Sequence, residues 1–406
     1  MIRVLIADDS AFMRKVLSDL FHGQPDFEVV GTAMNGKDAI SKVKQFEPDL
    51  LTMDINMPVM DGLDALAVIM EECPMPVVML SSLTQQGTDA TIRALSLGAV
   101  DFISKAGGSI SRIDTIESEI LRKCRNAAGA KVYRNIRTDM SPPTADSNAS
   151  QSEPPVMKRV ALPRRQGLKL RGDMPTAPLP APDSLRGVGG RRNNPLLRNR
   201  AMPETIPARS VGPIGAGAHR LVVIGTSTGG PQALQNVITQ LPGRLSCGVV
   251  VVQHMPPGFT KALADRLDSI SQVAVKEAED GDVIRAGCVY IAPGDFHLRI
   301  KEDGGVRRIA LGKEPPVGNH RPAVDVMFDS AAAVGRNLVA VIMTGMGSDG
   351  CAGMEKIKDA GGYSIAQDES TCVVYGMPKA VVDAGLADEV RPVQMIARAS
   401  VEAVNR

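Results

Sequence analysis

Apolar runs alternate with amphipathic stretches along the first part of the chain. Each run has the length of a β-strand, and each stretch between them carries apolar residues at helical spacing. Strands that alternate strictly with helices indicate a parallel sheet covered on both faces. The expected strands are residues 4–8, 27–33, 50–54, 76–82 and 101–105, and the expected helices lie near 12–22, 36–45, 61–72, 87–97 and 111–126. We therefore predict one doubly wound, five-stranded domain over residues 1–126.

The same kind of pattern returns near residue 218 and continues to the last residue. An alternating segment over 296–311 is centred on Asp303-Gly304-Gly305 and is typical of a β-hairpin. The expected strands are 219–225, 247–254, 288–293, 337–345 and, more weakly, 363–368, with helices near 231–240, 259–269, 323–335, 351–360 and 393–405. The sequence thus predicts a second doubly wound, mainly parallel α/β domain with a β-hairpin over residues 218–406.

Residues 127–217 keep neither a helical nor a strand period. They are rich in Pro, Gly, Ser and Asn, and such a segment buries too little apolar surface to offset the entropy lost on ordering. Between Met157 and Arg200 there are eleven Lys or Arg against two Asp. We predict a disordered basic linker, which is either a solvated spacer or an arm that touches an acidic partner.

Composition and charge narrow the function classes. Lys plus Arg number 46 and Asp plus Glu 45, so the chain as a whole has no field that recruits nucleic acid. No stretch approaches 18 uncharged apolar residues, and the first residues resemble a strand more than a signal peptide, so we expect no membrane insertion. The six cysteines are scattered without metal-ligand spacing, which favours a reduced, cytoplasmic protein.

Three carboxylates follow strands of the first domain. Asp8 and Asp9 end the first expected strand and Asp54 ends the third, so they should meet at one edge of the sheet. Mg²⁺ prefers oxygen ligands and would offset their repulsion. The fourth strand ends in Ser81-Ser82 and the fifth in Lys105, which add a hydroxyl and a cation to the same edge.

These residues, with NMPVMDG after Asp54, resemble the receiver domain of two-component response regulators. The resemblance covers roughly residues 1–125 and implies a flavodoxin-like fold. It implies that Asp54 accepts a phosphoryl group from a histidine kinase and that Mg²⁺ binds Asp8, Asp9 and Asp54. It also implies that Ser81 is the switch hydroxyl, Phe102 the switch aromatic residue and Lys105 the contact to the phosphoryl group.

In the second domain a hydroxyl, an imidazole and a carboxylate each follow a buried strand. Ser227 follows the first, His254 the second and Asp349 the fourth, so neighbouring strands would assemble a nucleophile, a base and an orienting acid. Residues 225–229 also satisfy G-x-S-x-G, a strand–turn–helix mount for a serine. Asp295, which likewise follows an apolar run, is the rival for the acid.

Nucleotide binding is a weaker interpretation of the glycines around Ser227. Pro231 stands where a phosphate-binding loop needs Lys, and Ser227 stands where a dinucleotide fingerprint needs Gly.

The motifs IGTSTGGPQAL, VVQHMPPGFT, YIAPGDFHL, HRPAVDVMF and TGMGSDGCAGM resemble the catalytic domain of chemotaxis protein-glutamate methylesterases, the CheB family. The resemblance implies Ser227 as nucleophile, His254 as base and Asp349 as orienting acid, with no cofactor in this domain. Their expected neighbours in the active site are Thr226, where the family usually has Ala, Thr228, Gly229 and Met346.

By the same resemblance, the substrates are glutamate γ-methyl esters on cytoplasmic helices of chemoreceptors, which are hydrolysed with release of methanol. Specific receptor glutamines would also be deamidated to glutamate. Phosphorylation of Asp54 would relieve blocking of the active site by the receiver domain. The alternative is a response regulator whose second domain only binds DNA or protein, and the basic linker is the feature in its favour.

Overall fold

The computed structural model describes residues 1–82, 84–105, 113–130, 132 and 220–406. The predicted linker falls almost entirely outside these described residues, and so does the loop after the fifth strand, residues 106–112. Among the described residues, no helix combines the length and the apolar character needed to cross a bilayer.

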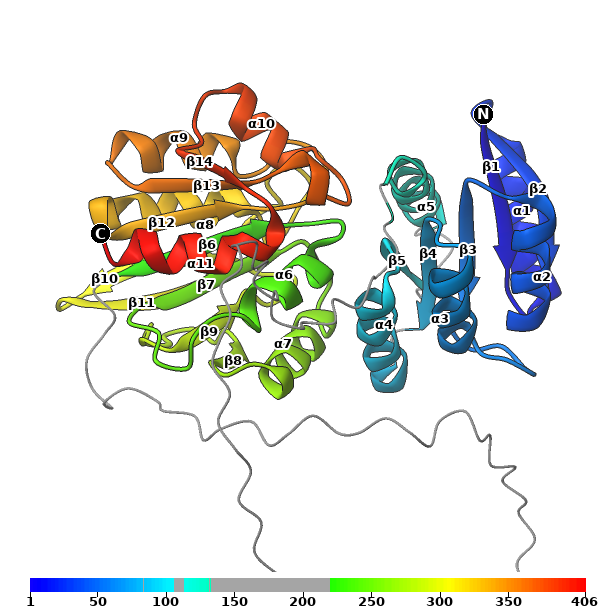
Figure 1. Cartoon of the computed structure of the whole chain (residues 1–406), viewed down its shortest axis with the longest axis horizontal. Helices are drawn as coiled ribbons and strands as arrows, with labels where there is room; N and C mark the ends of the chain where they lie inside the picture. The colour runs from blue at the N-terminus through cyan, green and yellow to red at the C-terminus, as the bar shows by residue number, and fades with distance from the viewer. Residues whose placement is uncertain (83, 106–112, 131, 133–219) are drawn as a thin grey trace, which may run out of the picture. The chain divides into compact units, whose positions relative to one another are not determined.

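The N-terminal sheet has five parallel strands, as predicted, and their order is β2-β1-β3-β4-β5. Helices lie on both faces of this sheet (Figure 1). The strands are β1 (Ile2–Ala7), β2 (Phe27–Ala33), β3 (Leu50–Asp54), β4 (Val77–Ser82) and β5 (Asp101–Lys105), and the helices are α1 (Ala11–His22), α2 (Gly36–Phe46), α3 (Gly62–Glu72), α4 (Gln85–Leu97) and α5 (Ile113–Ala128).

Polar side chains start the first four helices. The side-chain oxygens of Ser10, Asn35, Asp61 and Thr84 each accept a hydrogen bond from the backbone N–H three residues later. Such caps satisfy donors that have no partner inside the helix, and each stabilises its helix by about 1 kcal/mol. The strand ends and these caps together explain why the predicted boundaries lie close to the observed ones.

The C-terminal sheet has seven parallel strands in the order β14-β13-β12-β6-β7-β9-β8. The predicted hairpin is present as the antiparallel pair of β10 and β11. The strands are β6 (Leu221–Thr226), β7 (Gly248–Gln253), β8 (Ala274–Glu277), β9 (Cys288–Ile291), β10 (His297–Asp303), β11 (Val306–Gly312), β12 (Leu338–Ile342), β13 (Tyr363–Gln367) and β14 (Glu389–Arg391).

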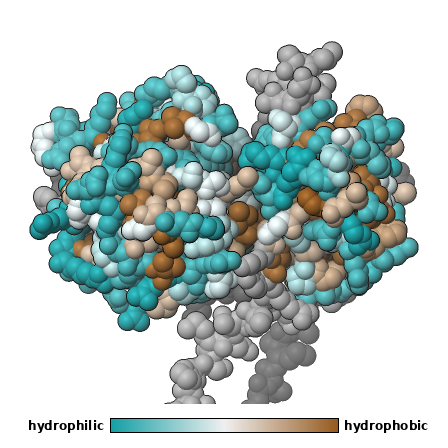
Figure 2. Space-filling model, turned by 90° about the horizontal axis from the view of Figure 1, so that it is seen from above, coloured by the Kyte–Doolittle hydropathy of each residue, from teal (hydrophilic) through white to brown (hydrophobic). Residues whose placement is uncertain are grey.

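Helices cover both faces of this sheet as well, with α6, α7 and α11 on one face and α8, α9 and α10 on the other (Figure 1). The helices are α6 (Gly230–Ile238), α7 (Phe259–Ile270), α8 (Val324–Ala331), α9 (Cys351–Asp359), α10 (Met377–Asp383) and α11 (Val393–Val404), with 3₁₀ turns η3 (Ala332–Asn337) and η4 (Glu369–Thr371). On the face drawn in Figure 2, hydrophilic residues predominate and apolar residues form small groups.

Strand β6 lies at the centre of this sheet. It pairs with β7 on one side and with β12 on the other, and the three strands run parallel. Their carboxyl ends therefore lie next to one another, at the kind of edge where open α/β sheets bind ligands. Segments that are far apart in the sequence meet there.

Gly225 lets helix α8 approach the end of β6. A Cβ at this position would lie 2.3 Å from Cγ1 of Val324, the first residue of α8. The absence of a side chain is therefore a packing requirement at this glycine.

We predict that Gly225→Ala destabilises the C-terminal domain, because the added methyl group forces α8 away from β6. The expected loss in the free energy of unfolding is about 1–3 kcal/mol, as for other overpacked cores. Urea unfolding checks this, with Gly243→Ala as the matched control because a Cβ there meets its nearest atoms at 3.5 Å. Equal midpoints for the two variants would contradict the prediction.

Candidate active site

Ser227 lies in the turn between β6 and α6. Its N–H donates to the carbonyl of Thr344 at 3.0 Å, and its own carbonyl accepts from the N–H of Gly230 at 2.8 Å. Gly229 has a φ of 77°, and a Cβ there would lie 2.5 Å from Cβ of Val373. Glycine is needed for this conformation and for this close contact. The turn thus presents the Ser227 hydroxyl at the strand end.

His254 links Ser227 to Asp349. Its Nδ1 lies 3.1 Å from Oγ of Ser227, and its Nε2 lies 2.7 Å from Oδ2 of Asp349. The side chains of His254 and Asp349 are only 6% and 10% exposed. In the serine protease template Nε2 faces the serine and Nδ1 the aspartate, so the ring here is used in the opposite sense. With its proton on Nε2, His254 can accept a proton from Ser227 at Nδ1.

The first turn of α8 holds the carboxylate of Asp349. Oδ2 accepts from the N–H of Val324 at 2.7 Å, and Oδ1 accepts from the N–H of Asp325 at 2.8 Å. Burial by itself would raise the pKa of Asp349, but the hydrogen bond and charge of His254, with these two backbone donors, hold the pKa below its ordinary value. Asp349 is therefore ionised at neutral pH, and a helix N-terminus favours that charge.

Asp295, the rival acid, has different partners. Its carboxylate pairs with the guanidinium of Arg321 and lies 3.5 Å from Nζ of Lys313. The hydrogen bond from Arg321 lowers the pKa of Asp295, against a smaller effect of burial. Arg321 also donates to the carbonyls of Lys313 and Glu314. Asp295 thus fastens the loop before α8, and Asp349 is the carboxylate that contacts His254.

His320 belongs to this fastened loop and was not predicted to be at the site. Its ring stacks on that of His254, with centroids 3.8 Å apart and planes 7° apart. Burial, together with the neighbouring His254, lowers the pKa of His320 to about 4. His320 is therefore neutral at neutral pH and packs against the candidate base. Its place in the loop GNHRP offers no periodic signal from which this contact could be inferred.

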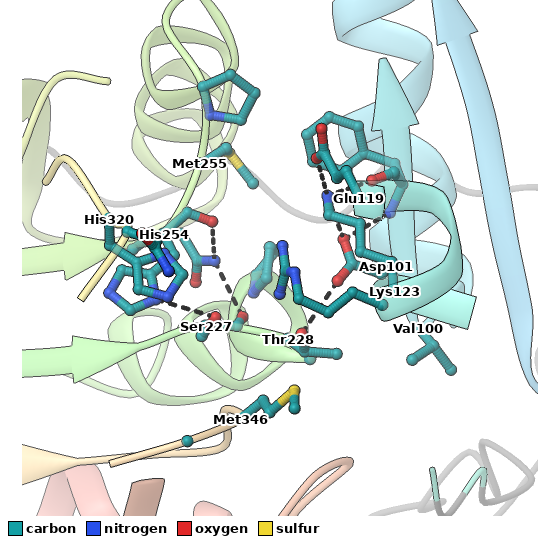
Figure 3. Close-up of a pocket in the computed structure, with 18 of the residues that line it drawn as sticks. Val100, Asp101, Glu119, Lys123, Ser227, Thr228, His254, Met255, His320 and Met346 are labelled. Carbon is teal, nitrogen blue, oxygen red and sulfur yellow. Dashed lines mark hydrogen bonds and ion pairs between the residues drawn. The ribbon is translucent and has the colours of Figure 1, made fainter. Parts of the chain in front are cut away.

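The remaining predicted neighbours surround Ser227. Thr226 is buried and its hydroxyl donates to the carbonyl of Thr344. Met346 is 41% exposed and, with Ser227, Thr228, His254 and His320, lines a cavity of about 770 Å³ (Figure 3).

Residues of the N-terminal domain line the same cavity, and both sheets belong to one compact unit. Oδ2 of Asp101 accepts a hydrogen bond from the hydroxyl of Thr228 at 3.0 Å, and Lys123 lies 3.2 Å from the same carboxylate (Figure 3). The rings of Phe102 and Phe259 pack with centroids 4.4 Å apart. The predicted switch aromatic residue therefore touches α7.

The acidic cluster of the first domain is also assembled. One oxygen from each of Asp8, Asp9 and Asp54 lies within 4.8 Å of the others. Nζ of Lys105 lies 2.8 Å from Asp8 and 3.0 Å from Asp54. Burial raises the pKa of Asp54 despite the opposing charge of Lys105. Ser81, which is buried at the same edge, donates to the carbonyl of Gly87 and accepts from the hydroxyl of Thr91.

Comparison with known proteins matches each of the two domains to a family. Residues 222–399 match the family model of the CheB methylesterase, and residues 4–115 match that of the response regulator receiver domain. A protein-glutamate methylesterase/protein-glutamine glutaminase of Symbiobacterium thermophilum is 45% identical over 99% of this chain and 97% of its own length. One of Pyrococcus abyssi is 42% identical over 99% of this chain and 94% of its own length.

Among solved structures, the CheB methylesterase catalytic domain of Thermotoga maritima is 51% identical. It covers 46% of this chain and 99% of its own, with a TM-score of 0.45.

We predict that His320 makes the protein less stable in mild acid. The folded-state pKa of about 4 lies below the ordinary value of 6.5, so between these pH values only the unfolded chain takes up the proton. Stability from this group is therefore present at pH 7 and lost as the pH falls towards 4. Thermal unfolding should show a smaller drop between pH 7 and pH 5 for His320→Asn than for wild type. His22→Asn, on the exposed end of α1, should keep the wild-type drop; equal drops for all three proteins would refute the prediction.

Proposed function

Because the chain belongs to the CheB family of protein-glutamate methylesterases/protein-glutamine glutaminases, we propose that Ser227, His254 and Asp349 form its catalytic triad. The chain is an enzyme of this class linked to a response regulator receiver domain. The observation that carries the proposal is the continuous hydrogen-bonded series from Oγ of Ser227 through His254 to Asp349. This membership also removes the alternative of a C-terminal domain that only binds DNA or protein.

In this mechanism Oγ of Ser227 attacks the γ-carbonyl carbon of a glutamate methyl ester while its proton passes to Nδ1 of His254. Asp349 stabilises the resulting imidazolium and keeps the ring in place. His254 then returns the proton to the departing methoxide, which leaves as methanol, and water releases the glutamate from Ser227. With a glutamine substrate the leaving group is ammonia, and the product is the same glutamate.

The N–H of Thr228 is our candidate donor to the oxyanion that forms during attack. The N–H of Ser227 is already bonded to Thr344, whereas no described residue accepts from the N–H of Thr228. Thr228 follows the nucleophile and precedes α6, where the helix dipole favours negative charge. Thr226 and Gly229 hold the backbone on either side of this turn.

We assign the substrate to the cytoplasmic helices of chemoreceptors, since the family acts on protein glutamate and glutamine side chains. The phosphodonor would be a histidine kinase that transfers its phosphoryl group to Asp54. Mg²⁺ fits the three clustered carboxylates of Asp8, Asp9 and Asp54, because they offer only hard oxygen ligands. When bound, it would neutralise charge on the incoming phosphoryl group, while Lys105 contacts the phosphoryl oxygens.

The receiver domain would regulate the enzyme because residues of both domains line one cavity. Asp101 and Lys123 of the receiver domain line the cavity that contains Ser227, and Asp101 holds the hydroxyl of Thr228. A substrate helix cannot occupy the same space. Phosphorylation of Asp54 would therefore activate the enzyme by favouring an arrangement in which these contacts are broken.

Ser227→Ala should abolish methanol release from methylated receptor, with a fall in kcat of at least about 10³-fold, as for loss of a serine nucleophile. Labelling with a fluorophosphonate probe should be lost as well. The matched control is Ser246→Ala, an exposed serine whose hydroxyl faces Asn405, which should keep wild-type activity. Unchanged methanol release from the Ser227 variant would rule out the triad.

Asp101→Ala should raise the activity of the unphosphorylated enzyme, because it removes the acceptor of the Thr228 hydroxyl. Stimulation by a small phosphodonor should shrink accordingly. Asp19→Ala, on the exposed face of α1, should leave both activities at the wild-type level. Asp54→Asn should keep the low basal activity and lose the stimulation. Blocking by the receiver is contradicted if Asp101→Ala has wild-type basal activity and full stimulation.

A further inference from the structure

Gln253, the last residue of β7, is buried at the centre of the candidate active site, with 2% exposure. Its Nε2 donates to the carbonyl of Ser227 at 2.9 Å and to the carbonyl of His254 at 3.1 Å. One side-chain amide thus joins the backbones of the candidate nucleophile and base. Both N–H groups of the amide are used in this way.

The bond to Ser227 has a consequence for the next residue. The peptide between Ser227 and Thr228 is planar, so the direction of the Ser227 carbonyl determines the opposite direction of the Thr228 N–H. The carbonyl is held by two donors, Gln253 and the N–H of Gly230. Donation to the carbonyl also polarises the peptide and strengthens its N–H as a donor.

We propose that Gln253 is a positioning residue that aims the Thr228 N–H at the oxyanion while keeping Ser227 in line with His254. This inference rests on the proposed triad and adds a residue that acts through the backbone of Ser227, Thr228 and His254. It assigns to Gln253 a contribution to kcat, because the oxyanion exists only during reaction.

The packing around Gln253 accounts for the second glycine of the STGG turn. Gly230 does not have a positive φ, so its backbone conformation does not require glycine. A Cβ at Gly230 would, however, lie 1.9 Å from Oε1 of Gln253 and 2.5 Å from Oγ1 of Thr226. The turn therefore keeps a residue without a side chain where the amide enters.

The amide oxygen of Gln253 indicates that this side chain is not optimised for the stability of the fold. Oε1 of Gln253 is buried, and no described residue donates to it. An apolar side chain of similar size would lose the bonds to two carbonyls but would also remove this buried acceptor, so we expect a small net change in stability. Stability and catalysis should therefore separate in variants of this residue.

The experiment compares Gln253→Glu and Gln253→Met in the full chain, with Gln240→Glu as matched control. Gln240 is exposed just after α6, and among the described residues its side chain bonds only to Asn236. Loss of an oxyanion donor lowers kcat by about 10²–10³-fold, so we expect kcat for methanol release to fall by up to that factor, and by at least about 10-fold, in both Gln253 variants, with little change in KM. Gln240→Glu should match wild type.

Two further readouts separate positioning from a purely structural role. In Gln253→Met the pH midpoint of kcat/KM should stay at the wild-type value, because no charge near His254 changes, and the melting temperature should stay close to wild type. If Gln253→Met does not fold, Gln253→Glu carries the test through its kcat and KM. A kcat within about twofold of wild type in a folded variant overturns the proposal, as does a loss that appears only in KM.

Failure of this inference is distinguishable from failure of the proposed function. An inactive Ser227→Ala with a fully active Gln253→Glu removes only the role of Gln253. An active Ser227→Ala removes the triad and this inference together.

Discussion

The geometry of the C-terminal domain depends on keeping a charged carboxylate in a nearly buried place. Desolvation opposes the ionised form of Asp349, and the protein offsets it with two backbone N–H groups at the start of α8 and with the ring of His254. Helix α8 reaches this position because Gly225 has no side chain. The position of this carboxylate sets the orientation of the His254 ring, and the ring in turn orients the hydroxyl of Ser227.

Much of this arrangement could be predicted from the sequence, because it depends on strand ends. Buried parallel strands are marked by continuous apolar runs, and polar residues directly after them stand out. This identified Ser227, His254, Asp349 and the cluster of Asp8, Asp9 and Asp54. The sequence does not determine the order of the strands, and the position of β12 beside β6 decides between Asp349 and Asp295.

Contacts made by loops and by short edge strands could not be predicted in the same way. Strands β8 (AVKE) and β14 (EVR) are short and carry charged residues, so they lack the continuous apolar run that marks the predicted strands. His320, which stacks on His254, lies in a loop that is held by the long-range ion pair of Arg321 and Asp295. Gln253 ends a predicted apolar strand, and its proposed role depends on a hydrogen bond to a turn 26 residues earlier.

If phosphorylation of Asp54 controls the enzyme as proposed, the hydrogen bond between Asp101 and Thr228 has a second thermodynamic consequence, which runs from the active site back to the receiver. Coupling free energies are reciprocal. If phosphorylation of the receiver favours substrate binding at the active site, substrate binding favours the phosphorylated receiver by the same free energy. A receptor segment seated over Ser227 would displace Asp101 from Thr228 and so favour the phosphorylated form of the receiver. The enzyme's substrate would then act as an effector of its own signalling input, and the abundance of methylated sites would be sensed at Asp54.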